Sequence, residues 1–112
     1  MEDKDVFILD EIIGYCDKIT DVISKRGRSF ESFRNDTEYQ DLCAFRAMQV
    51  GEYVNSLSEK FKNNHPDIPW YKIVAFRNII SHDYGKIDYE IMWNAITEDI
   101  PMLRDFCASI IK

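Results

Sequence analysis

Four side chains that can do chemistry lie within eight residues of one another: Arg77, Asn78, His82 and Tyr84. Histidine titrates near neutrality, so His82 can accept or donate a proton. The arginine guanidinium is a rigid fork of donors that fits phosphate oxygens. An acid–base group beside a fixed cation is what a reaction at a phosphate needs.

The spacing of these residues sets which of them share a face of a helix. At about 100° per residue, Asn78 and His82 lie about 40° apart, whereas Arg77 and His82 differ by about 140°. Arg77 therefore reaches the same cleft only through its long side chain, or because the helix distorts near Gly85. Tyr84 lies about 20° from Arg77 and shares its side if the helix persists that far.

The surrounding pattern predicts the helix that positions this segment. Pro66 and Pro69 end the preceding helix, and Pro69 suits the first position of the next one. Gly85 is placed to end that helix in a left-handed conformation. His65, in the proline-containing loop, is interpreted as structural or solvent-facing. Lys86 could contact a phosphate, although solvent exposure is the simpler interpretation.

Helical periodicity recurs in the first half of the chain. A first helix is predicted over roughly residues 3–25, and its inward positions are Val6, Leu9, Ile13, Cys16, Thr20 and Ile23. Gly27 ends it, and Phe30 and Phe33 in the connector are expected to contact the core.

A second helix is predicted to run to about residue 63. Its cap is one of three short polar residues, Asn35, Asp36 or Thr37. Besides its main apolar line it carries a second one, consisting of Phe45, Met48 and Tyr53. A helix with two apolar lines has two neighbours, of which one is its own core and the other could be a second subunit.

The last part of the chain continues the helical pattern. Asp88 can cap a helix that Pro101 interrupts after Asp99, and a final helix follows from about Leu103. Trp70 and Trp93 are interpreted as core residues. The predicted fold is all-α: an up-and-down bundle of four to five helices, in which residues 1–112 form one domain.

Composition narrows the possible functions. The formal net charge of −6 gives no electrostatic footprint for bulk nucleic-acid binding, so any contact with RNA must be local. Cys16, Cys43 and Cys107 lack metal-binding spacing and are interpreted as buried free thiols. The acidic N-terminus lacks the features of a signal peptide, and no apolar run is long enough to span a membrane. A cytoplasmic protein without a membrane contact is expected.

The chain resembles the HEPN family, and in particular its HepT branch of ribonuclease toxins. The Arg-polar-x-x-x-His pattern followed by x-Tyr carries this resemblance. Four segments resemble that branch: Arg46 to Glu52, His65 to Trp70, Arg77 to Tyr84, and Asp99 to Pro101.

This resemblance implies a HEPN-like fold and an endoribonuclease that cleaves RNA as a symmetric homodimer, without metal or other cofactor. Arg77 and His82 would be catalytic, and Asn78 would hold a phosphate oxygen or orient His82. The ribose 2′-hydroxyl would attack the neighbouring phosphate, giving a cyclic phosphate. Because one chain has only one suitable histidine, two chains supply a base and an acid more easily than one.

The resemblance also implies a partner. In the HepT branch, the tyrosine that matches Tyr84 accepts AMP from a minimal nucleotidyltransferase antitoxin of the MntA type, which silences the toxin. A modified Tyr84 would add bulk and negative charge beside Arg77 and His82.

Two alternatives remain open from the sequence. The chain could be a non-catalytic HEPN module that binds a nucleotide or a partner, because a shared fold does not guarantee activity. It could also be a structural helical dimer in which the polar segment is an interface network, with Arg77 in an ion pair.

Overall fold

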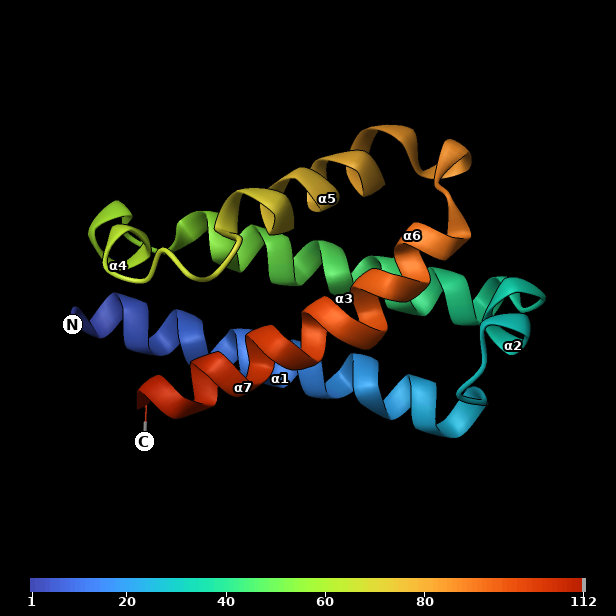
Figure 1. Ribbon diagram of the computed structural model, residues 1–112, viewed down its shortest axis with the longest axis horizontal. Helices are drawn as coiled ribbons and strands as arrows, with labels where there is room; N and C mark the ends of the chain where they lie inside the picture. Colours follow the sequence, from blue (N-terminus) through green and yellow to red (C-terminus); the bar gives the residue numbers. More distant parts are fainter. Residues whose placement is uncertain (112) are drawn as a thin grey trace.

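The computed structural model describes residues 1–111, and these residues form helices and no strand (Figure 1). The elements in chain order are α1 (Asp3–Arg26), α2 (Phe30–Arg34), α3 (Thr37–Ser56), α4 (Glu59–Asn63), α5 (Trp70–Asp83), the 3₁₀ turn η1 (Tyr84–Lys86), α6 (Tyr89–Asn94), the π-helical turn η2 (Ala95–Asp99) and α7 (Ile100–Ile111). The predicted all-α class is confirmed.

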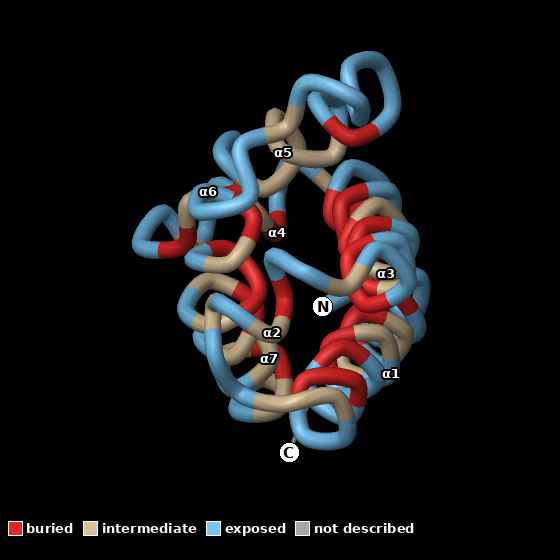
Figure 2. The backbone as a smooth tube through the Cα atoms, turned by 90° about the vertical axis from the view of Figure 1, so that its right-hand side faces the viewer, coloured by how far each residue is buried: buried red, intermediate tan, exposed pale blue. Residues whose placement is uncertain are grey.

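Three long helices enclose the core. α1 packs against both α3 and α7, and α3 also packs against α5. Figure 2 shows that the buried parts of α1, α3 and α7 face one another across the molecule, whereas α5 lies at its margin and is mostly half-buried or exposed. The helix that carries the candidate site is therefore attached to the body on one side.

The buried face of α1 differs from the predicted one at its edges. Leu9, Cys16 and Ile23 are buried as predicted, but Val6, at 40%, and Thr20 are exposed. The buried face of α1 also includes Ile8, Ile12, Ile19 and Val22, together with the carboxylate of Asp5. α1 contacts two helices, so its buried stripe is wider than the narrow line used for the prediction.

Short polar residues begin several of the helices. Asp88 caps α6 as the sequence predicted, and Asp36 is the one of the three candidates that caps α3. The side chain of Asp36 accepts one backbone N–H of the first turn and that of Asp88 accepts two. The connector contains the short helix α2, and Phe33 in it is fully buried. Gly27 ends α1 with a φ of 110°, a left-handed value that glycine adopts without steric cost.

The second predicted helix is too long. α3 ends at Ser56, and Ser58 starts α4 by accepting the N–H of Phe61. The buried carboxylate of Asp5 accepts both the backbone N–H of Ser58, at 2.9 Å, and its hydroxyl, at 2.7 Å. This long-range pair stabilises the break between α3 and α4, and a local pattern does not reveal it.

The predicted interruption at Pro101 is also wrong. α6, η2 and α7 follow one another without a loop (Figure 1). In the π-helical turn the Ile100 N–H bonds to the carbonyl of Ala95, five residues earlier. This wider turn shifts the hydrogen-bond pattern just before the proline, so the missing N–H of Pro101 does not break the helix.

The remaining core predictions have mixed outcomes. All three cysteines are buried and free, as expected. Met48 and Tyr53 of the second apolar line pack against the core of their own chain, whereas Phe45 is 56% exposed. None of the helices within residues 1–111 is long and apolar enough to cross a membrane.

Candidate functional site

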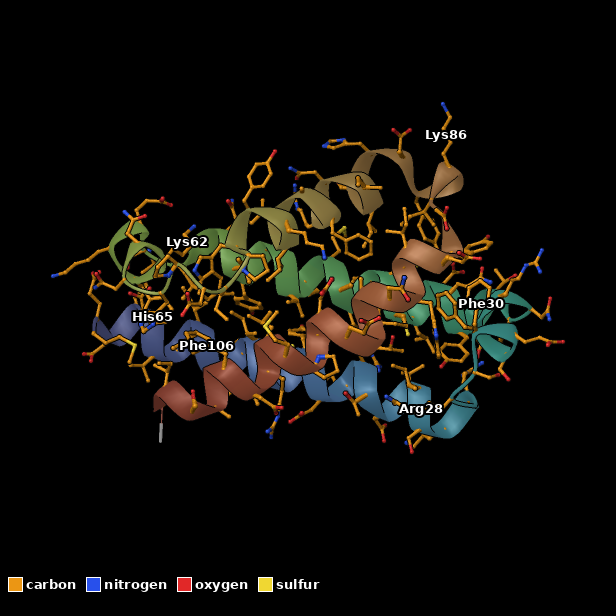
Figure 3. The ribbon with its side chains drawn as sticks, viewed as in Figure 1. Arg28, Phe30, Lys62, His65, Lys86 and Phe106 are labelled. Carbon is orange, nitrogen blue, oxygen red and sulfur yellow. The ribbon has the colours of Figure 1, made fainter. Side chains whose placement is uncertain are left out.

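The loop before α5 is built on aromatic packing. The ring of His65 lies 4.6 Å from that of Phe61 and 5.2 Å from that of Phe106, measured between centroids, and the indole of Trp70 donates to the His65 carbonyl at 2.9 Å. Figure 3 shows His65 and Phe106 together at one end of the molecule. His65 is therefore a structural residue, and Trp70, which is 8% exposed, belongs to the core as predicted.

α5 begins one residue later than predicted. Pro69 is the capping residue rather than the first helical one, and its carbonyl accepts the N–H of Ile73. The helix then runs to Asp83 with only Trp70 and Ile80 buried. Asn78 and His82 are exposed. The side of α5 that carries the candidate chemistry therefore faces away from the core.

Arg77 lies at a close approach between α5 and α3. A Cβ added at Gly51 would lie 2.3 Å from the Cβ of Arg77, which is far inside van der Waals contact. Only glycine therefore allows this approach. The Nε group of Arg77 forms an ion pair with Glu52, the residue after this glycine. Gly51 and Glu52 together hold the base of the arginine side chain against α3.

The far end of Arg77 contacts another candidate residue. Its Nη1 donates to the Oδ1 of Asn78 at 2.7 Å. α5 remains helical to Asp83, so the separation of about 140° between Arg77 and His82 persists, and no distortion brings them together within one chain. The structure thus joins Arg77 with Asn78 and leaves His82 apart on the same helix.

Gly85 does not end α5 in a left-handed conformation. Gly27 has the only positive φ among the described residues. The helix ends earlier, because Asp83 leaves helical geometry at φ −141° and ψ 33°, and the chain enters the 3₁₀ turn η1. The N–H of Ile87 closes this turn on the carbonyl of Tyr84. Figure 3 shows Lys86, at the end of η1, pointing away from the body, as the exposure interpretation predicted.

Tyr84 turns back toward the body. Its hydroxyl donates to a carboxylate oxygen of Asp41, on the first half of α3. Partial burial and this hydrogen bond to an anion raise the pKa of the Tyr84 hydroxyl well above its usual range. The hydroxyl is therefore protonated at neutral pH and held by a residue 43 positions earlier in the chain.

A groove of about 420 Å³ runs beside α5, between it and the α6–η2–α7 run. Its lining is mainly apolar and includes Ile79 and Ile91, which are 47% and 58% exposed. Lys72 and Asp99 form an ion pair of 3.2 Å within the same groove. An exposed apolar surface thus lies next to Asn78 on α5.

This combination of a helical fold and a segment with Arg77, Asn78, His82 and Tyr84 agrees with a known family. Residues 10–110 match the family described as ribonuclease HepT-like. The chain belongs to the HepT-like ribonuclease family. The resemblance to the HepT branch of HEPN proteins is therefore confirmed.

Several curated sequences are similar to this chain. The protein named "Putative RNase TTE0752" from Caldanaerobacter subterraneus is 28% identical over 93% of this chain and 91% of its own length. The protein named "Probable ribonuclease HepT" from Thermococcus cleftensis is 34% identical over 67% of this chain and 68% of its own length. No solved structure matches the chain significantly.

Three residues that contact the candidate site were not singled out from the sequence: Asp41, Gly51 and Glu52. Gly51 and Glu52 do fall in a segment that resembles the HepT branch, which was the available signal. Asp41 carries no comparable signal, because only the fold brings it to Tyr84. Within residues 1–111, no three or more His, Cys, Asp or Glu side chains gather in a way that could hold a metal ion.

Proposed function

We propose that this protein is the toxin of a toxin–antitoxin pair: a metal-independent endoribonuclease that acts in the cytoplasm as a homodimer. The proposal rests on the two side chains that α5 presents in a chain of the HepT-like family. An exposed imidazole, His82, follows an arginine that is already fixed by its neighbours, Arg77. Three buried free thiols suit a reducing compartment.

Arg77 and His82 divide the chemistry between them. One His82 accepts the proton of the ribose 2′-hydroxyl as its oxygen bonds to phosphorus, and a second, protonated His82 gives a proton to the 5′-oxygen as the P–O bond breaks. The products are a cyclic phosphate and a free 5′-hydroxyl. Arg77 stabilises the charge on the phosphorane oxygens, and Asn78 keeps the guanidinium in place.

The number of histidines argues for two copies at one site. The chain has two histidines, and His65 is packed between aromatic rings at the end of the molecule opposite to the C-terminal end of α5 (Figures 1 and 3). One protomer therefore offers one histidine to an RNA at α5. The exposed Ile79 and Ile91 beside the groove supply apolar surface that a second copy can cover.

The test is cleavage of a labelled RNA by purified variants, together with growth of cells that express them. His82→Ala and Arg77→Ala are expected to lose roughly 10²- to 10⁴-fold in cleavage rate. Tyr71→Phe, an exposed change on the same helix, should cleave normally. If folded His82→Ala cleaves at the wild-type rate, His82 has no part in the mechanism.

The same segment supports a mode of silencing. We propose that a minimal nucleotidyltransferase antitoxin of the MntA type transfers AMP from ATP to Tyr84. The phenolic oxygen bonds to the α-phosphorus, the bond to the departing pyrophosphate breaks, and the phenolic proton passes to a base. Incubation with that enzyme and ATP should add the mass of AMP to wild type and not to Tyr84→Phe.

One observation is also compatible with a second function, a non-catalytic module that binds a nucleotide or a partner. The Arg77 guanidinium is already engaged by Glu52 and Asn78, which suits a static binding surface as well as a catalytic one. The two functions differ in the cleavage assay, because a binding module retains RNA or nucleotide without turnover.

A further inference from the structure

The residues around His82 form a segment with little support of its own. All six residues from Ser81 to Lys86 are exposed, and they lie between the buried Ile80 and the half-buried Ile87. Figure 1 shows this end of α5 and η1 projecting from the body. Segments with few buried contacts open locally at a low free-energy cost. The position of His82 therefore depends on the contacts that hold this segment against the body.

The side chain of Tyr84 makes one such contact, the Asp41–Tyr84 tie. Its hydroxyl donates to the carboxylate of Asp41, which lies on α3 and thus on the body of the molecule. A hydrogen bond to an ionised acceptor is stronger than one between neutral groups. Asp41 itself is exposed, and it is not needed to cap α3, since Asp36 does this.

We infer that the Asp41–Tyr84 hydrogen bond positions the segment that carries His82, so that Asp41 is a positioning residue for the site. This inference rests on the proposed function, because that function makes His82 a catalytic residue. It also specifies how a group on the Tyr84 oxygen silences the protein. Such a group removes the O–H donor and puts a negative phosphodiester beside a carboxylate, which pushes residues 81–86 away from α3.

Hydrogen–deuterium exchange of the purified chain tests the tie without any RNA. Tyr84→Phe removes only the hydroxyl, and Asp41→Ala removes the acceptor. Each should raise amide exchange over residues 81–88 roughly tenfold. The double variant should exchange no faster than either single one, because both remove the same contact. Asp41→Asn, which keeps a neutral acceptor, should fall in between.

Two matched controls separate the tie from general effects of the substitutions. Tyr71→Phe removes a hydroxyl from an exposed tyrosine of α5, and Asp10→Asn removes a charge from an exposed aspartate of α1. Both should leave exchange over residues 81–88 unchanged. Wild-type exchange in Tyr84→Phe and Asp41→Ala, or additive effects in the double variant, would overturn the inference.

RNA cleavage then tests whether the tie serves the site. Asp41→Ala should lower kcat roughly tenfold with a smaller change in KM, because misplaced His82 impairs proton transfer more than RNA binding. Faster exchange with normal kcat would overturn the positioning role. If wild type itself cleaves no RNA, the proposed function fails, whereas the exchange result still decides whether Asp41 holds this segment.

Discussion

α1 and α5 are both helices packed on α3, yet they are held there in different ways. α1 buries eight of its 24 residues, whereas α5 buries two of 14. The contact between α1 and α3 is a broad apolar surface. α5 packs on the core with half-buried apolar side chains such as Ile73, Val74 and Phe76. Its position against α3 also involves the close approach at Gly51 and the ion pair between Arg77 and Glu52, and the Tyr84–Asp41 hydrogen bond holds η1, which follows it.

The comparison separates stability from function in this chain. Burial of apolar side chains provides most of the free energy of folding, so α1, α3 and α7 should determine global stability. A few specific contacts contribute little to that total but fix where polar side chains lie. Changes in the body should therefore alter unfolding, and changes at the α3–α5 contact should alter the proposed cleavage.

The largest expected effect on stability is a cavity in the body. Leu103 on α7 is fully buried, so Leu103→Ala should lower the free energy of unfolding by about 2–5 kcal/mol, measured by urea denaturation. Cleavage per folded molecule should be unchanged. The adjacent Met102→Ala, at a position that is 39% exposed, should stay within about 0.5 kcal/mol of wild type. Equal effects at both positions would contradict the burial argument.

A smaller effect on stability, with a larger one on cleavage, is expected at Gly51. Gly51→Ala forces α5 away from α3, which should cost roughly 1–3 kcal/mol and reduce cleavage at least about tenfold. Gly14→Ala is the matched control, because a Cβ at this helical glycine meets nothing within 4 Å. It should stabilise the protein by up to about 1 kcal/mol. Normal cleavage by Gly51→Ala would show that this contact does not position the site.

The smallest effect, counted per pH unit, is expected at alkaline pH and involves the thiols of the body. Burial raises the pKa of Cys43 and of Cys107 to about 12. In the unfolded chain a thiol ionises near pH 8.5, so between these values ionisation favours only the unfolded state. Stability is thus complete below about pH 8.5 and falls as pH rises toward 12, by roughly 1 kcal/mol per pH unit for each thiol.

Denaturation at a series of pH values measures this slope. Cys43→Ala should reduce this slope by the contribution of one thiol, once the stability lost with the packing of the side chain has been subtracted. An identical slope in this variant would mean that other groups, such as buried tyrosines, cause the alkaline loss. Tyr39 is one candidate, because burial raises its pKa to about 12 as well.

Local features of the chain could be predicted because their causes lie within a few residues. Asp36 and Asp88 cap helices, Gly27 ends α1, and the Arg77–Tyr84 segment lies on one helix and the turn that follows it. Hydrogen bonds within one turn and the 3.6-residue period suffice for such predictions. The HepT-like pattern needed no more than residue order.

The tertiary structure alone decided the contacts between distant residues. Asp5 with Ser58, Gly51 with Arg77 and Asp41 with Tyr84 are separated by 53, 26 and 43 positions along the chain. No periodic pattern marks such pairs, because each depends on how two helices approach one another. The sequence thus determined which groups are available for chemistry, and the packing of α5 on α3 determined which of them are held in place.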